Sequence, residues 1–125
     1  MIDNLNISEL KEILVNFAKI REWEKFHSPK NLSMAIAGEA GELLEIFQWL
    51  TEQESINVRK DLIVKEKVSH ELADIILYII RLADQLNINL NEAVLQKITI
   101  NNGKYPVSKV KGSAKKYSDY PSSLA

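Results

Sequence analysis

The fold is decided by residues 59–86, which read RKDLIVKEKVSHELADIILYIIRLADQL. Apolar residues recur here every three or four positions, as they do on the buried face of a helix. Residues 75–80 alone could also form a buried strand, but the whole stretch is too long for one. It predicts a helix that is apolar on several sides, and that lies at the centre of a bundle or at a subunit contact.

Two helices are expected before this stretch. The first begins at a cap formed by Asn6 or Ser8 and runs to about Phe26. The second begins near Pro29, because a serine cap followed by proline at the first helical position is a start signal. Polar residues 51–57 then lack any apolar period, and they are expected to form a loop.

A fourth helix is expected after the decisive stretch. Asn89, with Glu92 three residues later, resembles a helix cap, and the helix ends by Gly103. Four helices with short links predict an all-α fold, a four-helix bundle that oligomerises through its helices. The change to a basic composition near the end predicts one helical domain at residues 1–108 and a basic tail at residues 109–125.

The composition excludes several classes of protein. With 16 basic and 17 acidic residues the net charge is -1, so no global field favours a nucleic-acid polymer or a membrane as partner. No cysteine is present, which leaves carboxylates, histidines and hydroxyls as the available chemistry. The polar start and the lack of a long apolar segment predict a cytoplasmic protein.

Four acidic residues form two pairs with the same spacing. Glu39 and Glu42 lie three apart on the expected second helix, and Glu71 and Asp74 repeat that spacing on the third. Residues three apart share one face of a helix, so each pair can converge on a single cation. A glycine directly precedes each acid of the first pair, and the free-energy cost of glycine inside a helix indicates close approach by another helix or a phosphate.

The setting of these acids predicts a metal site. Burying four carboxylates without a counterion would cost too much, and a divalent cation removes that problem. Oxygen ligands favour Mg²⁺, with Mn²⁺ as the other candidate, and leave positions for water and substrate phosphate. Hydrolysis of a phosphoanhydride follows from such a site.

Other interpretations of the acids remain open. They could line an exposed helix face and pair with lysines. A redox di-metal bundle would need two Glu-x-x-His pairs, and only Glu24 with His27 fits that pattern. The chain could also be a non-catalytic nucleotide-binding bundle, or a structural helical oligomer.

The acid motifs and their surroundings resemble a known family. Glu39-Ala40-Gly41-Glu42 and Glu71-Leu72-Ala73-Asp74, together with residues 26–32, 38–49 and 97–106, resemble the all-α nucleotide pyrophosphohydrolases. The resemblance is strongest to the MazG-like branch that includes the dCTP pyrophosphatases. It covers most of the chain. Residues 102–104 depart from the run of arginines in some of these relatives, which weakens any substrate assignment from animal-type enzymes.

The resemblance implies a magnesium-dependent enzyme that sanitises the nucleotide pool. A metal-activated water would cleave a nucleoside triphosphate, dCTP or a modified pyrimidine nucleotide, to the monophosphate and pyrophosphate. The protein would be a homo-oligomer, a dimer or a tetramer. The catalytic residues, which are also the metal ligands, would be Glu39, Glu42, Glu71 and Asp74.

The resemblance also assigns substrate-binding residues. His27, Trp49 and Tyr78 would contact the base and sugar, because aromatic planes stack on bases and imidazole hydrogen-bonds. The triphosphate would be contacted by Lys97, Asn101 and Tyr105. The alternatives are core positions for Trp49 and Tyr78, a surface lysine at 97, and a helix-start role for His27. Residues 111–117 would close over the phosphates or form a solvated terminus.

Overall fold

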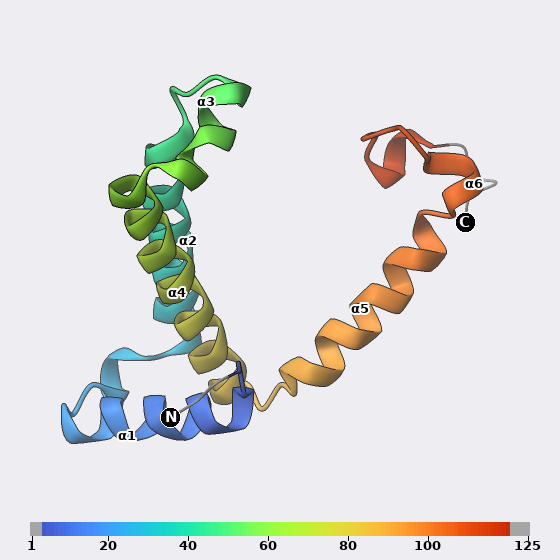
Figure 1. Ribbon diagram of the computed structural model, residues 1–125. Coiled ribbons are helices and arrows are strands. Elements are labelled where there is room, and N and C mark those ends of the chain that lie inside the picture. The colour runs from blue at the N-terminus through green and yellow to red at the C-terminus, as the bar shows by residue number, and fades with distance from the viewer. Residues whose placement is uncertain (1–3, 121–125) are drawn as a thin grey trace. The chain divides into compact units, whose positions relative to one another are not determined.

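The computed structural model describes residues 4–120, and within them the only regular elements are helices (Figure 1). The all-α class is therefore confirmed. The chain divides into two units, the first ending at Ile88 and the second beginning at Asn89. The helices are α1 (Ile7–Ile20), η1 (Glu24–Phe26), α2 (Pro29–Phe47), α3 (Glu52–Asn57), η2 (Val58–Lys60), α4 (Leu62–Gln85), α5 (Leu90–Lys104), α6 (Val107–Val110) and η3 (Tyr117–Asp119), where η marks a 3-10 helix.

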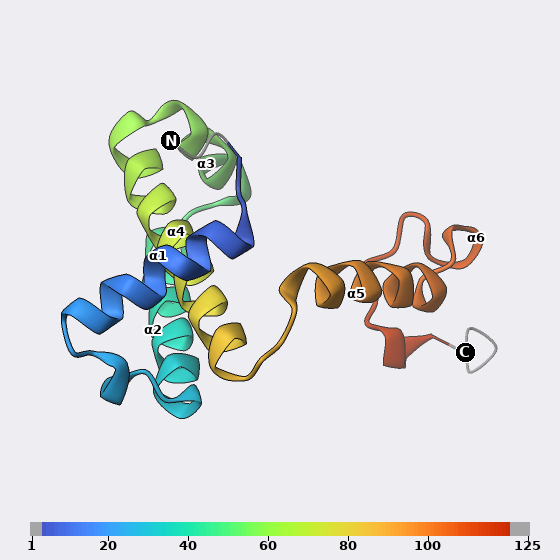
Figure 2. The same ribbon diagram turned by 90° about the horizontal axis from the view of Figure 1, so that it is seen from below.

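The first unit is built on the pairing of α2 with α4. The two helices run side by side in opposite directions, and α1 crosses the pair and packs on α4 (Figures 1 and 2). The Ser28 hydroxyl caps α2 by accepting from the Asn31 amide, and Pro29 occupies the first helical position as expected. The buried apolar side chains of this unit are Ala18, Leu32, Ile80 and Ala83.

Helix α4 is the long helix predicted from residues 59–86. Asp61 caps it, because its carboxylate accepts from the amides of Ile63 and Val64. Several apolar side chains of α1 and α4 stay exposed in the single chain, among them Ile13 at 54% and Ile76 at 37%. Burial of these side chains against another subunit stays a prediction.

The first helix is shorter than predicted. It ends at Ile20, not near Phe26, because Glu22 adopts a left-handed backbone with φ of 54° that an α-helix cannot contain. A single 3-10 turn, Glu24–Phe26, follows and leads to the cap of α2. Apolar spacing alone does not reveal such a break.

The prediction of a loop at residues 51–57 is wrong. Helix α3 lies there, and a reciprocal capping box begins it: the Thr51 hydroxyl accepts from the Glu54 amide, and the Glu54 carboxylate accepts from the Thr51 amide. The Thr-x-x-Glu pattern was readable in the sequence. An exposed helix can be polar on all sides, so the lack of an apolar period does not distinguish it from a loop.

The second unit contains the predicted fourth helix. Asn89 caps α5 by accepting from the Glu92 amide, and α5 ends at Lys104. After it, the Tyr117 ring packs edge-on against Tyr105, with the ring centroids 6.1 Å apart. The place of α5 in a four-helix bundle and the boundary at residue 108 stay predictions. No helix among the described residues has the length and apolar character to cross a bilayer.

Candidate active site

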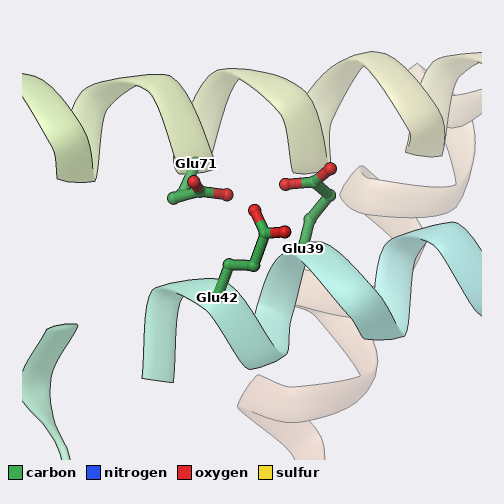
Figure 3. A group of neighbouring side chains, drawn as sticks. All are labelled: Glu39, Glu42 and Glu71. Atoms are coloured by element: carbon green, nitrogen blue, oxygen red, sulfur yellow. The ribbon is translucent and has the colours of Figure 1, made fainter. Parts of the chain in front are cut away.

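Three acidic side chains meet in the gap between α2 and α4. Glu39 and Glu42 point from α2 and Glu71 points from α4, toward a common point (Figure 3). One carboxylate oxygen from each lies within 4.8 Å of the others. The i, i+3 spacing on α2 puts two acids on the face that α4 covers, and α4 brings the third. The geometry therefore unites three of the four acids that the sequence singled out.

Glu39 and Glu71 each have a carboxylate oxygen that lacks a hydrogen bond within residues 4–120. One oxygen of each carboxyl group is buried, and no hydrogen-bond partner reaches it within the described residues. Proton sharing with Glu71 contributes most to raising the pKa of Glu39 to about 7, followed by burial and by the negative charge of Glu42. A buried polar atom without a partner costs free energy. The donor set fits a hard divalent cation.

Asp74 lies at the edge of this cluster. It is not among the three acids whose oxygens converge, although its negative charge also contributes to raising the pKa of Glu39. Asp74 and Glu42 are exposed, whereas Glu39 and Glu71 are half-buried. The expectation that all four carboxylates are buried is therefore wrong, because the site opens on one side of the helix pair.

The two glycines beside the acids face open space. A Cβ atom built on Gly38 or Gly41 would meet no atom within 4 Å among the described residues. Close approach of another helix within the described part of the chain therefore does not explain them. Contact of these glycines with a ligand phosphate stays a prediction.

A cavity of about 420 Å³ begins at Asp74 and extends toward α1. This volume lies in the range of pockets that bind small molecules. Its walls are largely apolar and aromatic, and its polar groups come from a few side chains. The lining residues are Leu10, Ile13, Leu14, Phe17, Trp23, His27, Asp74, Leu77, Tyr78 and Arg81.

The periodicity of α4 connects the acids to this cavity. Asp74, Tyr78 and Arg81 are separated by four and then three residues, so they follow one another along a single face of the helix. Glu71 lies one turn earlier on that face. A bound molecule that contacts the acids can therefore extend into the cavity.

Two of the three residues predicted to contact the base line this cavity. Tyr78 contributes from α4, and His27 contributes from the segment before α2. Burial and then the positive charge of Arg81 lower the pKa of His27, which favours the neutral imidazole. Trp49 lies after the opposite end of α2 and is 86% exposed, so the single chain does not bring it to the cavity.

The residues predicted to contact the triphosphate belong to the second unit. Lys97 and Asn101 lie four residues apart on one face of α5, and Tyr105, four residues further on, is the C-cap residue of this helix. Lys97 and Asn101 are exposed, and Tyr105 is half-buried beside Tyr117. Their contact with a substrate stays a prediction.

Sequence reasoning missed two residues of the cavity. Trp23 packs edge-on against both Phe17 and His27, with ring centroids 5.8 and 6.4 Å apart. Arg81 is 5% exposed and donates from Nε to His27 Nδ1 at 3.3 Å. A signal for Arg81 was present, because it is a charged residue directly after six mostly apolar ones and shares the face of Asp74. Nothing in the pattern distinguished Trp23.

Comparison with known proteins places the chain in a family. A model of the MazG-like family matches residues 34–120. dCTP pyrophosphatase 1 from Bos taurus is 38% identical over 92% of this chain and 68% of its own length, and the Homo sapiens protein of that name is 36% identical over the same shares. The crystal structure of a pyrophosphatase from Archaeoglobus fulgidus superposes with a TM-score of 0.75 at 40% identity, over 85% of this chain and 99% of that one. This chain belongs to the MazG-like family.

Proposed function

We propose that this chain, a nucleotide pyrophosphohydrolase of the MazG-like family, hydrolyses dCTP or a modified pyrimidine nucleoside triphosphate with Mg²⁺ as its cofactor. The products are the nucleoside monophosphate and pyrophosphate, and the reaction removes unwanted nucleotides from the pool. The observation that carries the proposal is the acid cluster that opens beside an aromatic cavity.

The acids would hold the metal. Glu39, Glu42 and Glu71 offer converging oxygens, and Asp74 borders both the cluster and the cavity. Bound Mg²⁺ would supply charge stabilisation for the phosphates and a more acidic water. The buried, unpartnered oxygens of Glu39 and Glu71 support this assignment, since a cation would satisfy both. The protein's own contribution is to fix ligands from two helices in one place.

The cavity would hold the nucleobase. Its aromatic rings offer flat apolar contact, and stacking of a base on such rings stabilises binding by about 1–3 kcal/mol per base. Tyr78 and His27 line it already, and Trp49 is the third proposed contact. The relatives named dCTP pyrophosphatase support a pyrimidine, which a cavity of about 420 Å³ accommodates.

Residues of the second unit would contact the triphosphate, and further subunits would cover exposed apolar side chains. Lys97 and Asn101 on one face of α5, together with the C-cap residue Tyr105, would contact the triphosphate, because a lysine ammonium provides a mobile positive charge for phosphate oxygens. The half-exposed apolar side chains of α1 and α4 support a homo-oligomer, a dimer or a tetramer, that covers them.

A nucleotide panel tests the proposed function. Purified protein with Mg²⁺ or Mn²⁺ is incubated with each natural nucleoside triphosphate and with 5-substituted pyrimidine forms, and pyrophosphate and orthophosphate are measured separately. The highest kcat/KM is expected for a cytosine or modified pyrimidine nucleotide, with pyrophosphate as the product. Preference for a purine nucleotide would overturn the substrate assignment, and inactivity across the panel would overturn the enzymatic one.

A further inference from the structure

Arg81 is a buried charge that lines the cavity. Its Nε donates to His27 Nδ1 at 3.3 Å, and its Nη1 donates to Asp84 Oδ2 at 3.2 Å. Asp84 in turn pairs with Lys11 of α1, whose Nζ lies 3.6 Å from Oδ1. The network therefore joins α1, α4 and the segment before α2, and it holds the guanidinium in one orientation.

This contact decides which nitrogen of His27 carries the hydrogen. A guanidinium has only donors and stays protonated, so the imidazole nitrogen that faces it must offer a lone pair. Nδ1 of His27 is therefore unprotonated, and the neutral ring carries its hydrogen on Nε2. Within residues 4–120 no protein group accepts a hydrogen bond from Nε2.

We propose that Arg81 is a positioning residue for substrate recognition: it fixes His27 as an Nε2–H donor, which selects a base that presents a hydrogen-bond acceptor to the cavity. The carbonyl oxygen at position 2 and the ring nitrogen at position 3 of cytosine are such acceptors. A base edge that presents only a donor leaves both groups unpaired and is rejected. This inference rests on the proposed function, because it assigns the cavity to the nucleobase.

The tautomer is measured without any turnover. The chain has two histidines, so a ¹⁵N-edited spectrum of the side-chain nitrogens is assigned by comparison with a His70→Gln protein. At neutral pH, Nδ1 of His27 is expected to show the shift of an unprotonated nitrogen and Nε2 that of a protonated one. In Arg81→Lys the same tautomer should persist, because the ammonium still donates. In Arg81→Met the two tautomers should mix.

Kinetics then test the consequence for recognition. Loss of one neutral hydrogen bond weakens binding by about 2- to 13-fold. KM for the best pyrimidine nucleotide should therefore rise about tenfold in Arg81→Met, with kcat within about twofold, which is the signature of lost ground-state binding. Arg81→Lys should restore most of the affinity. The matched control is Arg59→Met, which removes an exposed arginine from η2 and should behave like wild type.

A double substitution shows whether Arg81 acts through His27. In a His27→Phe background, Arg81→Met should change KM by less than about twofold, because the positioned donor is already gone. Equal effects of Arg81→Met with and without His27 would overturn the proposal. So would a wild-type His27 protonated at Nδ1, a result that needs no variant to fold. Inactivity of the enzyme would contradict the proposed function and leave the tautomer measurement intact.

Discussion

The carboxyl groups of Glu39 on α2 and Glu71 on α4 face each other, and each keeps one buried oxygen that no described protein group satisfies. Their proximity is the largest cause of the raised pKa of Glu39. Two acids held this close are unfavourable when both are ionised, unless a cation lies between them. The close approach of these carboxylates therefore destabilises the helix pair without metal, and a bound cation would remove that destabilisation.

Metal binding should stabilise the folded chain. An ion that binds only the folded state adds about 2.7 kcal/mol when its concentration is 100 times its Kd, which raises the melting temperature by several degrees. Millimolar Mg²⁺ should therefore raise the melting temperature of the wild type, and should do so much less for Glu71→Gln. Glu66→Gln, an exposed acid on another face of α4, is the control and should respond like wild type. Identical responses of all three proteins would contradict the site.

Stability without metal should depend on pH through Glu39. Its pKa of about 7 in the folded chain exceeds the ordinary value of 4.5, so the folded state binds more protons than the unfolded state between these values. Stability contributed by this group is therefore present below pH 4.5 and is lost as the pH rises through 7. In EDTA, Glu39→Gln should melt only slightly above wild type near pH 5 and clearly above wild type at pH 8. With added Mg²⁺ at pH 8, the wild type should instead melt at a higher temperature than Glu39→Gln.

If the melting temperatures of Glu39→Gln and wild type in EDTA differ by the same amount at pH 5 and pH 8, the raised pKa of Glu39 is contradicted. Glu66→Gln serves again as the control, and its difference from wild type should not vary across this range.

The sequence predicted the scaffold better than the site. Caps at Ser28 and Asn89 and the apolar period of α4 located three long helices, because these signals act within a few residues. The acid spacing placed Glu39 and Glu42 correctly on one face. The contact of Arg81 with His27 depends on the antiparallel pairing of α2 and α4, and a periodic pattern does not contain that pairing.

Removing a ligand should abolish turnover without unfolding the protein. Loss even of a residue that only supports a metal ligand reduces metal affinity or activity by about 10- to 100-fold. Glu42→Gln and Asp74→Asn are isosteric and exposed, so each should lower kcat/KM by more than about 100-fold while the helical circular dichroism stays unchanged. Activity of Asp74→Asn within about threefold of wild type would show that the three converging acids suffice without Asp74.

Tryptophan fluorescence should report the base site. The chain has two tryptophans, and Trp23 lines the cavity while Trp49 does not. A nucleoside monophosphate should therefore quench the tryptophan fluorescence of a Trp49→Phe protein, in which Trp23 is the sole tryptophan. Quenching in Trp23→Phe would support the additional role proposed for Trp49. No quenching in Trp49→Phe at saturating nucleotide would contradict the placement of the base beside Trp23.

The most direct test of the central claim is ³¹P NMR of the products formed from dCTP by the wild-type protein with Mg²⁺. Cleavage at the acid cluster of Glu39, Glu42 and Glu71 predicts dCMP and pyrophosphate in equal amounts, no orthophosphate, and no reaction in EDTA or with Glu39→Gln. Formation of dCDP and orthophosphate, or turnover that persists in EDTA, would contradict it.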